Sequence, residues 1–193
     1  MGHRNAFATL CVVAALAAGC ASDPARFYTL SAVAGPAVAP SKLSLAVGPV
    51  SVPAAVDRPQ IVVSTSANQV ALDEFNRWAS PLQDSLSRVI AEDLVALLGT
   101  PRVTLYPQTS SADADYRIQV EVRSFESRPG KLASLDAVWT VRRAKDGKSE
   151  TGRTSAREPT ADASYDALAA AHSRGIARLS GDIADAVRAL ATQ

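Results

Sequence analysis

Two stretches of the chain, 116–123 and 135–142, alternate apolar and polar side chains. This two-residue period is typical of a β-strand with one buried face. Asp146-Gly147 follows the second stretch, and this dipeptide favours the tight turn of a hairpin because both residues tolerate positive φ. We therefore expect two long strands, and we expect residues 150–157 as a polar return strand with one exposed face.

Shorter runs that are apolar or β-branched predict further strands, each bounded by Gly, Pro, Asn or Ser. The turn-forming residues between the third and fourth of these runs indicate a second hairpin. The expected strands are 27–30, 43–47, 60–65, 70–72 and 102–106.

A spacing of three or four residues between apolar side chains predicts two amphipathic helices. The first begins at Ser80 as its N-cap, has Pro81 at its first helical position and ends at Gly99. The second covers 164–190, and its apolar stripe includes His172. These elements predict an α/β fold: a mixed, largely antiparallel sheet with two amphipathic helices packed on it.

The N-terminus has the pattern of an export signal. Arg4 precedes an apolar run at 6–18, which has the length of a signal-peptide core and is too short to span a bilayer as a helix. Two small residues then precede Cys20, and this end resembles the bacterial lipobox, whose cysteine is acylated before cleavage. The resemblance makes Cys20 the lipid-attachment residue and 1–19 a cleaved signal peptide. The alternative is an ordinary secreted protein with a chance cysteine at the cleavage site.

Cysteine use and composition divide the remaining chain. Cys11 lies in the signal, so Cys20 is the only thiol of the mature chain and no internal disulfide can form. Residues 20–41, rich in Ala, Pro and Gly, are interpreted as the lipidated N-terminus and tether, and 42–193 as a periplasmic domain. By resemblance to the sorting rules of enteric bacteria, Ser22 predicts the periplasmic face of the outer membrane, because no aspartate stands there.

Charge and residue inventory argue against nucleic-acid binding and against catalysis. The chain has 20 Lys and Arg against 19 Asp and Glu, and 5% aromatic residues. It offers neither clustered cations nor stacking platforms for a nucleic acid. His172 is the only histidine after 1–19 are removed, and the sequence has no phosphate loop, zinc-ligand spacing or serine elbow. We expect no catalytic residue, no metal and no cofactor besides the acyl groups. The carboxylate pairs at 73–74 and 113–115 leave a small periplasmic enzyme as a weak alternative.

Residues 47–62 and 74–82 resemble the ABC-type transport auxiliary lipoproteins, the Pqi-type subunits of membrane-integrity transporters. The first segment contains Asp-Arg-Pro-Gln at 57–60, and the second contains Arg-Trp-Ala at 77–79. Weaker similarity continues at 170–173, so the resemblance covers most of the mature chain.

This resemblance implies a membrane-anchored, non-catalytic auxiliary component of an MCE/ABC-type lipid transport system that maintains outer-membrane integrity. Its partners would be an MCE-domain protein and an ABC or Pqi-type inner-membrane permease, and a homo-oligomer is a further alternative. Arg58 and Trp78 are the candidate partner-interface residues, although Trp78 is also placed to pack on the helix that follows it. The competing hypothesis is a structural or assembly lipoprotein that scaffolds an outer-membrane or cell-wall complex.

Overall fold

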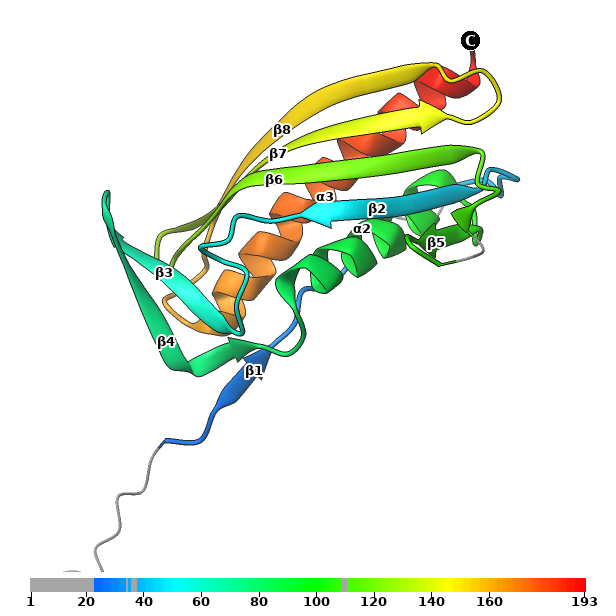
Figure 1. Ribbon diagram of the computed structural model, residues 1–193. Coiled ribbons are helices and arrows are strands. Elements are labelled where there is room, and N and C mark those ends of the chain that lie inside the picture. Colours follow the sequence, from blue (N-terminus) through cyan, green and yellow to red (C-terminus); the bar gives the residue numbers. More distant parts are fainter. Residues whose placement is uncertain (1–22, 34, 36–37, 109–110) are drawn as a thin grey trace, which may run out of the picture.

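The computed structural model describes residues 23–33, 35, 38–108 and 111–193. The predicted signal peptide 1–19 and the acylation site Cys20 lie outside these residues. Figure 1 shows two β-sheets and two helices, with the described chain entering at the smaller sheet. Within the described residues, no helix combines the length and the apolar character that crossing a membrane requires.

The larger sheet has five strands in the order β5-β2-β6-β7-β8. β2 runs parallel to both of its neighbours, whereas β6, β7 and β8 form an antiparallel meander. In β6 and β7 every second side chain over most of the strand is buried, which confirms the alternation seen in the sequence. The strands are β2 (Leu45–Ser51), β5 (Val103–Leu105), β6 (Tyr116–Arg128), β7 (Leu132–Arg143) and β8 (Ser149–Pro159).

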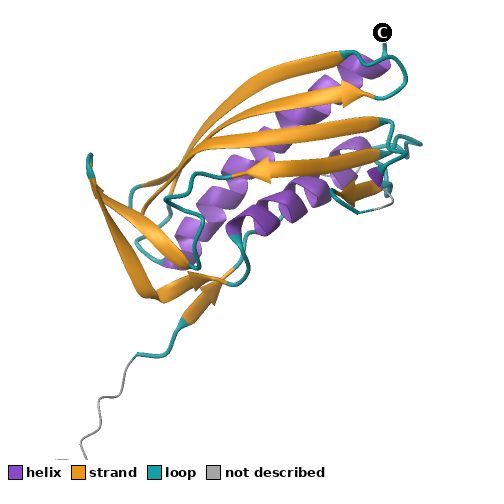
Figure 2. Ribbon diagram, in the orientation of Figure 1, coloured by secondary structure: helices purple, strands orange, loops and turns teal. Residues whose placement is uncertain are grey.

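Helices α2 (Leu82–Leu98) and α3 (Tyr165–Ala191) lie side by side on one face of the larger sheet (Figure 2). α3 packs on β7 and β8, α2 packs on β2, and the two helices contact each other. Their apolar stripes meet the inward side chains of the sheet in one continuous core. The expected α/β class with two amphipathic helices on a mixed sheet is therefore confirmed.

The smaller sheet has three strands in the order β1-β4-β3. They are β1 (Arg26–Tyr28), β3 (Gln60–Ser66) and β4 (Gln69–Trp78); β1 runs parallel to β4, and β3 runs antiparallel to it. β1 falls within 20–41, the range assigned to the tether, and Leu30 just after it is 1% exposed. The folded part of the chain thus begins inside that range.

The sequence placed the end of α2 correctly and its start incorrectly. Gly99 has φ 62, the left-handed conformation that glycine adopts freely at a helix end. Ser80 is not the N-cap: Pro81 occupies that position with ψ 135, and no side chain caps the helix. Because Pro81 is extended, the first helical residue is Leu82, and the hydroxyl of Ser80 bonds that of Ser85 at 2.9 Å instead. α3 begins as expected after the N-cap Ser164.

β4 is much longer than the short strand predicted at 70–72. Residues 73–78, expected as a connection to the helix, continue the strand, and the last three of them, 76–78, pair with β1. The register shifts sharply between Ile61, which pairs with Asp73, and Gln60, which pairs with Arg77. β4 therefore carries a bulge here, and it bends where the smaller sheet turns towards α2 (Figure 1).

Candidate functional site

Arg58 and Trp78 meet at one cleft of about 340 Å³, although they come from different segments of the chain. The backbone N–H of Trp78 donates a hydrogen bond to the carbonyl of Pro59 at 2.8 Å, which holds the two segments together. Both walls come from the stretches that carry the family resemblance. The lining residues are Asp57, Arg58, Pro59, Trp78, Ala79, Ser80 and Pro81.

Trp78 forms the buried part of this cleft. Its side chain is 5% exposed, so it is a packing residue and not an exposed anchor. The end of β4 fixes its position by pairing Trp78 with Tyr28 of β1. Its indole lies edge-on to the rings of Phe125 and His172, each at a centroid distance of 6.2 Å. Trp78 therefore forms the buried floor of the cleft. Of the two candidate interface residues, Arg58 is the more accessible one.

Arg58 is partly exposed, and its guanidinium is incompletely paired. Its Nε is buried and has no hydrogen-bond partner among the described residues. Its backbone N–H is used locally, because it donates to the carbonyl of Val56 at 2.9 Å. A guanidinium has five donors in a planar fork, the geometry that matches a carboxylate or a phosphate. The cleft is thus suited to an acidic group of a partner.

Beneath the cleft, His172 belongs to the core, as the sequence indicated. The side chain is 1% exposed, and its Nε2 shares a hydrogen bond of 2.8 Å with the hydroxyl of Ser127. Burial lowers the pKa of His172 to about 3, so the ring is neutral near pH 7. A neutral, enclosed imidazole is poorly placed for general acid–base chemistry. Its partners Phe125 and Ser127 were not predicted, because nothing local in the sequence links β6 to α3.

The carboxylates of Asp73 and Glu74 have separate partners and do not face a common site. Asp73 accepts a hydrogen bond from the hydroxyl of Tyr165 at 2.7 Å and further bonds from Asn76. Burial tends to raise the pKa of Asp73, but the hydrogen bonds from Tyr165 and Asn76 outweigh burial and lower it. Glu74 points to Gln60 and Arg77 instead. Asp73 joins the smaller sheet to the start of α3.

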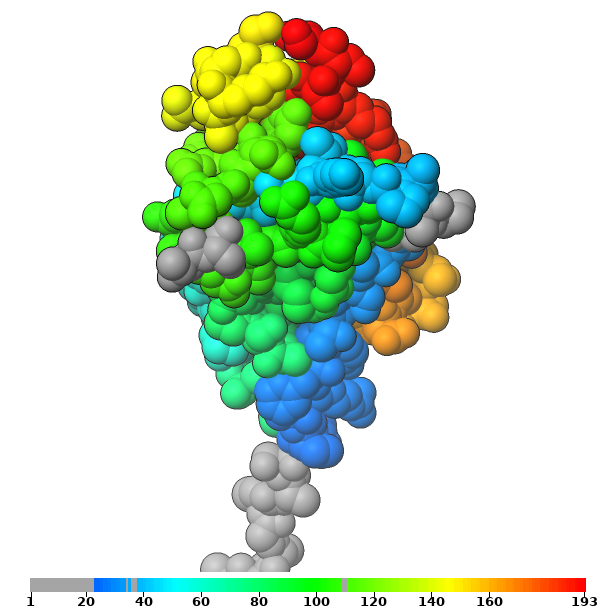
Figure 3. Space-filling view, turned by 90° about the vertical axis from the view of Figure 1, so that its right-hand side faces the viewer, coloured from blue at the N-terminus to red at the C-terminus, as the bar shows by residue number. Residues whose placement is uncertain are grey.

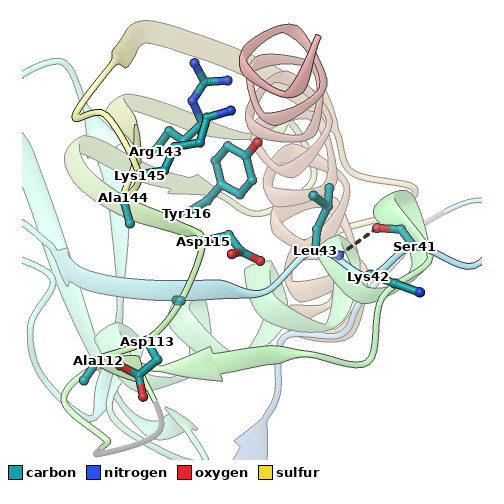
Figure 4. A pocket seen from close by; sticks show the side chains of 11 residues that line it. Ser41, Lys42, Leu43, Ala112, Asp113, Asp115, Tyr116, Arg143, Ala144 and Lys145 are labelled. Atoms are coloured by element: carbon teal, nitrogen blue, oxygen red, sulfur yellow. Dashed lines mark hydrogen bonds between the residues drawn. The ribbon is translucent and has the colours of Figure 1, made fainter. Parts of the chain in front are cut away.

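A larger cavity, of about 820 Å³, lies at the end of the larger sheet where β6 begins and β7 ends (Figure 4). Two of its charged groups, Asp115 and Arg143, already have partners within the fold. Asp115 accepts bonds from the backbone N–H and hydroxyl of Ser44, and these bonds lower its pKa. Arg143 is buried, pairs with Asp146 at 2.7 Å and also donates to the carbonyl of Leu190.

Metal ligands do not gather in the described part of the chain: no three His, Cys, Asp or Glu side chains lie close enough to hold an ion. Two amphipathic helices packed on a mixed sheet define an α/β domain. The family model described as "ABC-type transport auxiliary lipoprotein component" matches residues 28–184. The chain belongs to this family and is an auxiliary lipoprotein component of ABC-type transport.

Two solved structures show the same fold at low sequence identity. An uncharacterized protein superposes with a TM-score of 0.70 at 22% identity, covering 86% of this chain and 99% of its own. Protein XCC0632 from Xanthomonas campestris, assigned to the family DUF330, gives 0.65 at 19% identity, with 83% and 93% covered. A PelC dodecamer from Paraburkholderia phytofirmans reaches 0.40 at 18% identity, with 76% and 92% covered. No curated protein matches the sequence.

Proposed function

We propose that this chain is the lipid-anchored, non-catalytic auxiliary subunit of an MCE/ABC-type lipid transport system that maintains outer-membrane integrity. Family membership supports the transport role. The resemblance of 47–62 and 74–82 to Pqi-type lipoproteins supports the choice of an MCE-domain protein and its permease as partners. Acyl groups on Cys20 would hold the domain on the periplasmic face of the outer membrane.

The Arg58–Trp78 cleft is the observation that carries this proposal. The two family-like segments, separate in the sequence, form the walls of a single site. Within it, Arg58 presents a guanidinium whose Nε lacks an internal partner among the described residues. An acidic side chain of the transport partner would pair with the partly exposed side chain of Arg58 and fix the docking geometry.

Affinity purification from cross-linked, detergent-solubilised membranes tests the proposal. The tagged protein should recover an MCE-domain protein and its permease, and Cys20→Ala should lose them. Arg58→Ala should lower recovery about tenfold, the effect of one strong interface residue. Arg153→Ala is the matched control, because Arg153 is exposed on β8 and pairs with Asp136 within the fold.

Two results would contradict the proposal. Recovery of only barrel-assembly or cell-wall proteins would favour the scaffold hypothesis. An intact outer-membrane barrier after deletion of the gene, with no transport partner recovered, would exclude a role in lipid transport.

A further inference from the structure

Several large apolar side chains of the smaller sheet face water. Phe27 of β1 is 63% exposed and Phe75 of β4 is 42% exposed. Val70 and Leu72, also on β4, are exposed as well. Isolated exposed apolar residues are common on protein surfaces, but a group of them on one small sheet indicates a surface that is covered in use.

The register of β1 and β4 places the two phenylalanines together. Phe27 pairs with Arg77, and Phe75 directly precedes Asn76, the first residue of β4 that pairs with β1. Tyr28 and Trp78 pair on the opposite face, where the ring of Tyr28 lies tilted against that of Tyr165 of α3 and Trp78 enters the core. One face of the β1–β4 ladder is therefore packed, and the other carries the exposed ring of Phe27, with the exposed Phe75 next to the ladder.

This exposed face lies next to the point where the lipid anchor joins the fold. β1 begins at Arg26, six residues after Cys20. A fully extended chain spans at most about 3.3–3.6 Å per residue, so Arg26 lies within about 20 Å of the acylated cysteine. Figures 1 and 3 show the first described residues at one tip of the molecule. The short connection keeps this tip near the membrane that holds the acyl chains.

We propose that the β1–β4 face rests on the lipid bilayer, with the rings of Phe27 and Phe75 inserted at the boundary of headgroups and acyl chains. Aromatic rings gain by leaving water at this depth, and Arg77, which pairs with Phe27, can contact lipid phosphates. The proposal rests on acylation of Cys20, which is part of the proposed function. It adds a second contact that fixes the orientation of the domain, which the anchor alone leaves free to rotate.

A single fluorescent label tests this contact in the acylated mature chain. Acylation of Cys20 leaves that chain without a free thiol, so Glu74→Cys creates one labelling site beside Phe75. The protein is reconstituted with phosphatidylethanolamine–phosphatidylglycerol vesicles, recovered by flotation, and labelled with an environment-sensitive dye. Iodide should quench this dye about threefold less than the same dye at Lys145→Cys, because only the first label lies at the bilayer surface. Lys145 lies in the β7–β8 connection, at the other end of the larger sheet from the smaller one.

Removal of the rings should abolish the shielding. The pair Phe27→Ser and Phe75→Ser, made together in the Glu74→Cys background, should bring iodide quenching to the level found at Lys145→Cys. Val95→Ser is the matched control, because Val95 is an exposed apolar residue of α2 away from the smaller sheet. Circular dichroism of each variant verifies that the fold is retained.

The outcomes separate this inference from the proposed function. Equal quenching at positions 74 and 145 in floated protein overturns the membrane contact and leaves the anchor intact. Failure of the wild-type chain to float overturns both the lipoprotein assignment and this contact. Shielding in detergent without vesicles that rises with protein concentration assigns the face to a second copy of the chain, and so overturns the proposal.

Discussion

The imidazole of His172 lies flat against the ring of Phe125, with centroids 3.8 Å apart and ring planes inclined by 8°. The contact joins α3 to β6 directly beneath the Arg58–Trp78 cleft. Because the imidazole is enclosed and neutral, it acts as a stacking ring with one hydrogen bond to Ser127.

This burial predicts a loss of stability in mild acid. The pKa of His172 is about 3 in the fold, against an ordinary value near 6.5, so the unfolded chain takes up the proton first as the pH falls. The free energy of unfolding should therefore decrease below about pH 6.5, by up to about 1.4 kcal/mol per pH unit. His172→Leu should flatten this dependence between about pH 6.5 and 4.5. Urea denaturation at several pH values measures it.

Ser127→Ala provides the control for this experiment, because it removes the hydrogen bond to His172 and keeps the buried imidazole. Its pH dependence should follow that of the wild type, with a lower stability throughout. An unchanged slope in His172→Leu would show that other groups govern the acid response.

Tyr165→Phe should weaken the junction between α3 and the smaller sheet. The change removes the 2.7 Å hydrogen bond to Asp73 and leaves that carboxylate with its local bonds from Phe75 and Asn76. A hydrogen bond to a partly exposed charged group predicts a loss of about 1–2 kcal/mol in the free energy of unfolding. The pKa of Asp73 should rise, which NMR titration can measure. Tyr106→Phe, at an exposed tyrosine, should change neither quantity.

Gly152→Ala should disrupt the packing of Trp139. The two residues pair across β7 and β8, and a Cβ at position 152 would overlap the indole ring. The indole would have to move, which breaks its 3.1 Å hydrogen bond to Thr154. We expect a loss of about 1–3 kcal/mol in the free energy of unfolding and a changed near-ultraviolet circular dichroism signal.

Gly181→Ala in α3 is the matched substitution, because a Cβ there meets no atom within 4 Å. It should stabilise the protein by about 0.5–1 kcal/mol, since alanine favours the helix more than glycine does. A loss in Gly181→Ala as large as that in Gly152→Ala would contradict the packing argument.

Elements defined by local pattern were predictable from the sequence. The alternation in β6 and β7, the start of α3 near Ser164 and the C-terminal Gly99 each depend on neighbouring residues, and each is confirmed. The division into two sheets was not predictable, because it depends on the parallel pairing of β1 with β4. The polar residues Asp73 and Asn76 made the second half of β4 resemble a loop in the sequence. Their hydrogen-bond partners, Tyr165 and Tyr28, come from distant segments and could not be predicted locally.

The candidate site was predictable only in part. The resemblance singled out Arg58 and Trp78, but it contained no information that they share a cleft or that Trp78 is enclosed. A tryptophan before a helix has the same sequence signature whether it is exposed or buried. Trp78 is enclosed because its indole packs against the stacked rings of His172 and Phe125. This stack forms only after α3 docks on β6.

The attachment of β1 has a mechanical consequence for a protein held at both ends. Tension between the anchored cysteine and a bound partner would enter the domain through three paired residues of β1, and then through the buried Leu30. The carbonyl of Leu30 accepts a bond from Arg88 at 2.6 Å, and the next backbone N–H donates to Ser173 at 3.1 Å. Such a load would be shared between α2 and α3 before it reaches the larger sheet.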